Sequence, residues 1–79
     1  MITSSQIRAA RALIKWSAQK LADEAGVGIS TVQRMEKAEG LPTGSIKNLD
    51  LIQRTLENAG VEFIPENGGG VGVRLEKYL

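Results

Sequence analysis

The chain has 79 residues, a formal net charge of +1 and no cysteine, which excludes disulfides and thiolate metal sites. A chain of this length forms one domain with a modest core and leaves no room for a catalytic cleft between domains. Hydrophobic residues make up 42% of it but only three residues are aromatic, so the core must come from Leu, Ile, Val and Ala, which favours packed helices.

Hydropathy and charge narrow the class of protein further. No apolar run approaches the roughly 20 residues that cross a bilayer, and residues 1–6 lack the charged-then-apolar order of a signal peptide. We therefore expect a soluble, cytoplasmic protein. Residues 1–40 carry six basic and four acidic side chains, whereas residues 41–79 carry four and five. The small positive excess lies in the first half.

A capping box predicts where the first helix begins. Thr3 can accept a hydrogen bond from the backbone N–H of Gln6, and the Gln6 side chain can reach back. Spacings of three and four then separate an apolar stripe from a basic face. The stripe contains Ile7, Ala10 and either Leu13 or Ile14, and the basic face contains Arg8, Arg11 and Lys15.

The segment 17–37 has the pattern of two short helices that meet at a steep angle. Trp16 should end the first helix of the chain and anchor it to the next one, which Ser17 caps and which runs over 18–25. Small Ala22 suits the point where two helices cross, and Gly26 suits a corner with positive φ.

The second helix of this pair has an apolar side and a free side. Val32 and Met35 are spaced to pack against the preceding helix, which leaves the opposite face unoccupied. The helix starts at either Gly28 or Ser30, because the sequence from Ser30 to Gln33 is itself a capping-box match.

The remaining pattern predicts a longer helix and then a hairpin. A turn over 39–42 precedes Thr43 or Ser45, either of which can cap a helix that extends to Ala59 and stops at Gly60. Two short alternating segments around a glycine-rich loop then indicate a β-hairpin. The apolar stripe of the helix contains Ile46, Leu49, Ile52, Leu56 and Ala59, and the strands lie in 61–64 and 71–75.

A two-stranded hairpin is marginal alone in water, so this one must pack on the helices or pair with another chain. We favour a two-fold dimer, either by strand pairing or by apolar packing across the axis. The alternative is a hairpin that only closes the core of its own monomer. The expected dimer contacts are Val61, Phe63, Ile64, Val71 and Val73.

The residues from 7 to about 60 resemble the Cro/repressor-type (Xre-like, lambda-repressor-like) helix-turn-helix domain. The motifs that carry the resemblance are Arg-Ala-Leu-Ile-Lys-Trp-Ser at 11–17, Leu-Ala-x-x-Ala-Gly-Val at 21–27 and Ser-Thr-Val-x-x-Met-Glu at 30–36. The resemblance implies a mainly α domain of four to five helices over 1–60, with a β extension over 61–79 of the kind seen on small bacterial and prophage members.

The function implied by the resemblance is sequence-specific binding of double-stranded DNA by a transcriptional repressor. The second helix of the motif would lie in the major groove, with Gln33 pairing with adenine and Arg34 reaching guanine or phosphate. The alternatives for these two side chains are solvation, or pairing of Arg34 with Glu36 or Glu39. The residues implied to contact DNA are Ser17, Gln19, Gly28, Ile29, Ser30, Thr31, Gln33, Arg34 and Lys37.

The basic face of the first helix has two interpretations beside such a motif. Its three cations are either solvated or supply at least one contact to phosphate.

Other functions find less support. The Ser-x-x-Lys match at 17–20 lacks its companion motifs, the chain has no histidine to act as a base, and Gly68 to Gly70 lack the lysine and helix of a phosphate loop. We therefore expect no enzyme, metal or cofactor. RNA binding would need an aromatic stacking platform, which is missing. The open alternative is a protein-interaction module, such as an antitoxin-like or phage adaptor, with or without DNA binding.

Overall fold

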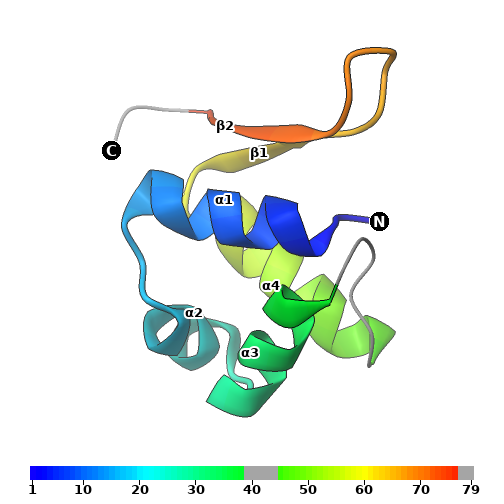
Figure 1. The fold of residues 1–79 in the computed structure, drawn as a ribbon. Coiled ribbons are helices and arrows are strands. Elements are labelled where there is room, and N and C mark those ends of the chain that lie inside the picture. The colour runs from blue at the N-terminus through cyan, green and yellow to red at the C-terminus, as the bar shows by residue number, and fades with distance from the viewer. Residues whose placement is uncertain (39–44, 77–79) are drawn as a thin grey trace.

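The computed structural model describes residues 1–38 and 45–76, and these form helices followed by an antiparallel hairpin (Figure 1). The predicted mainly α fold with a C-terminal β-hairpin is confirmed. The elements are α1 (Ser4–Ile14), α2 (Ala18–Ala25), α3 (Ile29–Lys37), α4 (Ile46–Asn58), β1 (Val61–Ile64) and β2 (Gly72–Leu75).

Side chains cap the starts of three helices. At α1 the full capping box forms: the Thr3 hydroxyl accepts from the Gln6 N–H (3.1 Å), and Gln6 Oε1 accepts from the Thr3 N–H (2.8 Å). Ser17 caps α2, as predicted, and Ser45 caps α4. The other predicted cap, Thr43, and the turn expected over 39–42 lie outside the described residues.

A residue with positive φ lies at or just after the end of three helices. Helix α1 stops at Ile14, earlier than predicted, because Lys15 adopts the left-handed conformation (φ +58°) and turns the chain before Trp16. Gly26 ends α2 at φ +73°, the corner expected for it, and Gly60 follows α4 at φ +105°. A positive φ strains any residue with a Cβ, which explains glycine at both positions.

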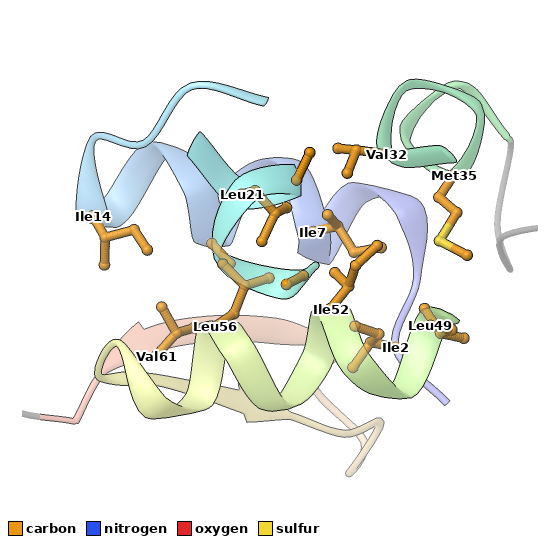
Figure 2. Packing of buried hydrophobic residues seen from close by; sticks show 13 residues of the cluster. Ile2, Ile7, Ile14, Leu21, Val32, Met35, Leu49, Ile52, Leu56 and Val61 are labelled. Atoms are coloured by element: carbon orange, nitrogen blue, oxygen red, sulfur yellow. The ribbon is translucent and has the colours of Figure 1, made fainter. Parts of the chain in front are cut away.

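One hydrophobic core joins the four described helices to the hairpin (Figure 2). Within the stripe of α1, Ile14 is buried and Leu13 is exposed, which decides between the two alternatives. The prediction for Ile46 was wrong: it is 73% exposed, because it is the first residue of α4 and lies at the margin of the packing. The buried residues are Ile2, Ile7, Ala10, Ile14, Leu21, Ala22, Ala25, Val32, Met35, Leu49, Ile52, Leu56 and Val61.

The hairpin packs on the helices of its own chain. Val61 is 1% exposed and belongs to the core, while Phe63 and Val73 pack against it. The amide of Gln6 donates hydrogen bonds to the carbonyls of Ile64 (3.2 Å) and Gly72 (2.9 Å), which face each other across the two strands. The hairpin lies on one side of α1, and α2 and α3 lie on the other (Figure 1).

The glycine-rich loop between the strands is organised by its own side chains. The Glu66 carboxylate accepts hydrogen bonds from the N–H groups of Gly68 (2.7 Å) and Gly70 (3.0 Å), and Asn67 accepts from Gly69 (3.2 Å). The bonds from Gly70 and then Gly68 hold the pKa of Glu66 below its ordinary value. The glycines therefore close a turn around a carboxylate.

Candidate nucleic-acid interface

The two helices of the motif meet as the spacing predicted. The Val27 N–H donates to the Ala22 carbonyl (3.1 Å) across the left-handed corner at Gly26, and Ala22 is fully buried. A larger residue than alanine at this position would separate the helices, since the buried interior has no spare volume. The corner thereby fixes where α3 begins.

Helix α3 begins after Gly28, which decides between the two predicted starts. Gly28 is the N-cap residue, and its carbonyl accepts from the N–H groups of Thr31 (3.0 Å) and Val32 (3.3 Å). No side chain caps this helix, so the capping-box match at Ser30 does not operate. Ser30 becomes the second helical residue and is exposed.

The two faces of α3 differ in character. Val32, Met35 and Glu36 are buried, whereas the opposite side presents exposed polar and basic side chains at spacings of three and four. Thr31 is half-buried, and Ile29 packs partly against the core, so neither projects freely. The exposed face consists of Ser30, Gln33, Arg34 and Lys37.

Glu36 does not reduce the positive charge of that face, because it turns inward to Arg11 on α1. The guanidinium binds the carboxylate through two hydrogen bonds, Nε to Oε2 (2.7 Å) and Nη2 to Oε1 (2.8 Å), and Nη1 donates to the Trp16 carbonyl (2.9 Å). Hydrogen bonding to Glu36 raises the pKa of Arg11. Arg34 is therefore left without Glu36 as a partner.

The end of α3 is held by further groups on α1. The Ser4 hydroxyl donates to the Met35 carbonyl, and Arg8 donates to the Glu36 carbonyl. Carbonyls at a helix C-terminus have no partner within the helix, so these side chains satisfy groups that would otherwise need water. We name this set, comprising Ser4, Arg8, Arg11 and their contacts on α3, the α1–α3 clamp.

The clamp changes the interpretation of the predicted basic face. Arg8 and Arg11 are engaged with α3, and of the three cations Lys15 is exposed and forms no ion pair within residues 1–38 and 45–76. This role of Arg11 was not predicted from the sequence, although the sequence carries a signal for it. Glu36 lies four residues after Val32 and one after Met35, on the buried side of α3, where a carboxylate needs a cationic partner.

The other predicted contacts lie on α2 and at the corner. Ser17 is exposed, but its hydroxyl accepts from the Lys20 N–H (3.0 Å). Gln19 donates to Asp23 (2.9 Å), while Lys20 pairs with Glu24 (3.4 Å) and lies 5.6 Å from the centre of the Trp16 ring. Trp16 is half-buried against the core, as an anchor between α1 and α2 should be.

Comparison with known families decides the class. The family described as Helix-turn-helix (HTH_3) matches residues 7–56, from α1 to near the end of α4. This chain belongs to the Cro/repressor-type, Xre-like helix-turn-helix family. Members are DNA-binding regulators, so this helix-turn-helix protein is one too. No curated protein matches the chain.

Two further observations concern the part of the helix-turn-helix protein that the structure describes. None of its described helices is both long and apolar enough to cross a membrane. Within residues 1–38 and 45–76 there is no group of three or more His, Cys, Asp or Glu side chains arranged to hold a metal ion.

Proposed function

We propose that this helix-turn-helix regulator binds specific double-stranded DNA sequences through the exposed face of α3 and acts as a repressor. The observation that carries the proposal is the position of Gln33 and Arg34 on that face, opposite the buried Val32 and Met35. An amide can pair with adenine and a guanidinium with guanine through two hydrogen bonds each. Repression requires only that an operator be occupied.

The remaining residues of the motif have supporting roles in this proposal. Lys37 and Ser30, also exposed on α3, contact phosphates beside the bases, since most hydrogen bonds to DNA go to its backbone. Ile29 packs partly against the core and offers at most an apolar edge to a thymine methyl. Ser17, Gln19 and Gly28 are exposed, and in this proposal they meet the DNA backbone beside the major groove.

We also propose that two copies act together on a palindromic site. Half-sites about 34–36 Å apart would place the major groove on the same side of the duplex for both copies of α3. Of the predicted dimer contacts, Val61 is buried in the core of its own chain, which removes it from the surface that a partner meets. Phe63, Ile64 and Val73 are half-buried, and Val71 is 46% exposed.

Binding to random duplex DNA, measured as salt is varied, tests the proposal. The affinity should fall steeply with salt, because each phosphate contact contributes about −0.9 to the slope of log K against log salt. Lys37→Ala should weaken all sequences alike and reduce that slope by about 1. Arg54→Ala removes an exposed cation of α4 that pairs with Asp50 (2.9 Å), and it should leave the slope unchanged.

One result would contradict the proposal and favour the alternative. A wild-type protein that is folded yet binds no duplex at any salt concentration would favour the protein-interaction module instead.

A further inference from the structure

The loop between the two strands of the hairpin contains an asparagine followed by a glycine. Residues 65–71 connect β1 to β2, and all of them are exposed. An asparagine side chain can react with the backbone nitrogen of the next residue, and glycine hinders this reaction least because it has no Cβ. Apart from its chain neighbours, nothing lies within 4 Å of where a Cβ would stand at Gly68. Asn67 and Gly68 are therefore sterically open to the reaction.

The reaction is a spontaneous ring closure that needs only water. The Gly68 nitrogen loses its proton to water, and its electron pair forms a bond to Asn67 Cγ. The bond from Cγ to Nδ2 breaks, and Nδ2 takes up a proton and leaves as ammonia. Water then opens the resulting succinimide ring, at Cγ to give an aspartate or at the main-chain carbonyl to give an isoaspartate. Nothing is oxidised or reduced.

The folded loop opposes the first step by holding the reacting nitrogen. The Gly68 N–H donates to Glu66 Oε1 at 2.7 Å, the length of a charge-assisted hydrogen bond, and the same oxygen accepts from the Gly70 N–H (3.0 Å). A hydrogen bond that the N–H donates and a negative charge beside it both disfavour loss of its proton. The bond also directs the N–H toward Glu66 and away from the Asn67 side chain.

The two partners of the reaction are both restrained. The bonds from Gly70 and then Gly68 hold the pKa of Glu66 below its ordinary value, so the carboxylate is ionised at neutral pH. Within residues 1–38 and 45–76 no cation pairs with Glu66 and removes its charge. Asn67 Oδ1 accepts from the Gly69 N–H (3.2 Å), which fixes the side chain that would be attacked.

We infer that Asn67 is a site of spontaneous conversion to aspartate and isoaspartate, and that the Glu66 carboxylate slows this conversion while the loop is folded. The inference concerns the hairpin loop alone and does not depend on the proposed binding of DNA. Any event that draws Glu66 away from Gly68 speeds the reaction.

The products change the loop in two ways. Either product adds a negative charge at position 67, next to Glu66. The isoaspartate also lengthens the main chain by one carbon atom, in a loop that has to bring Ile64 and Gly72 together as a pair. The carbonyls of these two residues accept from the Gln6 amide on α1. The modified hairpin is therefore held less firmly against the helix.

Deamidation rates of the full chain, folded and unfolded, test the inference. The protein is aged at slightly alkaline pH with or without guanidinium chloride, and the peptide that contains Asn67 is followed by mass spectrometry. Folded wild type should react at least about threefold more slowly than unfolded wild type, because the Gly68 hydrogen bond must break first. In the unfolded chain Asn67 should react faster than Asn58, which precedes Ala59.

Variants of Glu66 isolate the role of its carboxylate. Each variant is judged by the ratio of its folded to its unfolded rate, which removes the intrinsic effect of residue 66 on the chemistry. Glu66→Ala should raise this ratio at least about threefold, and Glu66→Gln, which keeps an acceptor without the charge, should raise it less. Glu62→Ala removes another carboxylate of the same hairpin, one that pairs with Arg74 (2.8 Å), and should keep the wild-type ratio.

Two results would overturn the inference. One is a wild type that reacts equally fast when folded and unfolded, and the other is an equal ratio for Glu66→Ala and Glu62→Ala. Trp16 fluorescence shows that each variant is folded at the start of the experiment. Because DNA is absent from this measurement, neither result bears on recognition by α3.

Discussion

A single buried side chain, Gln6, connects the first helix to the last strands of the protein. Its Oε1 accepts from the Thr3 N–H, and its Nε2 donates to the carbonyls of Ile64 and Gly72. The residue is 4% exposed, and every polar group of the amide has a partner. Glutamine is therefore required here for its donors as well as for its acceptor.

Gln6→Glu separates these two roles. Glutamate retains the acceptor that completes the capping box but replaces the donor with a carboxylate that faces two carbonyl oxygens. The unfolding free energy should fall by about 1–3 kcal/mol, the usual effect of leaving buried polar groups unpaired. Urea denaturation followed by Trp16 fluorescence measures the change.

The same chemical change at an exposed position serves as the control. Gln33→Glu on α3 should alter the unfolding free energy by less than about 0.5 kcal/mol. Equal stability of the two variants would show that Gln6 contributes through capping alone.

At the scale of elements, the α1–α3 clamp explains how α3, a helix of only nine residues, keeps a fixed orientation. Short helices are marginal in isolation, so tertiary contacts must hold them. Helix α3 lacks a side-chain cap at its start and is secured near its end by Ser4, Arg8 and Arg11. The clamp leaves the exposed face free.

Arg11→Gln tests the assignment of Arg11 to the clamp rather than to DNA. Loss of the paired hydrogen bonds should lower the unfolding free energy by about 2 kcal/mol, because Glu36 would keep a buried charge without its partner. The slope of DNA binding against salt should stay at its wild-type value. A slope reduced by about 1 would instead assign Arg11 to a phosphate.

An exposed ion pair serves as the comparison for the stability effect expected of Arg11→Gln. The Lys20–Glu24 pair is about half exposed on both sides, and Lys20→Ala should change the unfolding free energy by less than about 1 kcal/mol.

Local features of these elements could be predicted from sequence, and features that join distant residues could not. The cap at Ser17, the corner at Gly26 and the stop at Gly60 depend on a few neighbouring residues, and they form as expected. The Arg11–Glu36 pair and the contact from Gln6 to the hairpin span 25 and up to 66 positions. They depend on how the helices pack, which periodicity does not specify.

Ile46 illustrates the same limit for the core. Helical spacing correctly identified the face of α4 that carries Leu49, Ile52 and Leu56. Spacing does not show where along α4 the packing of the other elements ends, and Ile46 lies beyond that point. For the site, spacing identified the outward face of α3 but not the direction of Glu36, because its partner Arg11 lies on another helix.

At the scale of the whole molecule, α1 separates two surfaces with different proposed tasks. The hairpin lies on one side of α1 and α3 on the other (Figure 1), and α1 makes hydrogen bonds to both. A partner that bound on the hairpin side of α1 would therefore leave uncovered the face of α3 that is proposed to meet DNA. Dimerisation and recognition can coexist in a chain of 79 residues.

Selection of bound sequences from a random duplex pool, with wild type and Gln33→Ala in parallel, tests the central claim most directly. Wild type should enrich a palindrome with half-sites about one helical turn apart. Gln33→Ala should lose the base preference at one position of each half-site while the other positions keep theirs. A folded wild type that enriches no sequence over the starting pool would contradict reading of DNA by α3.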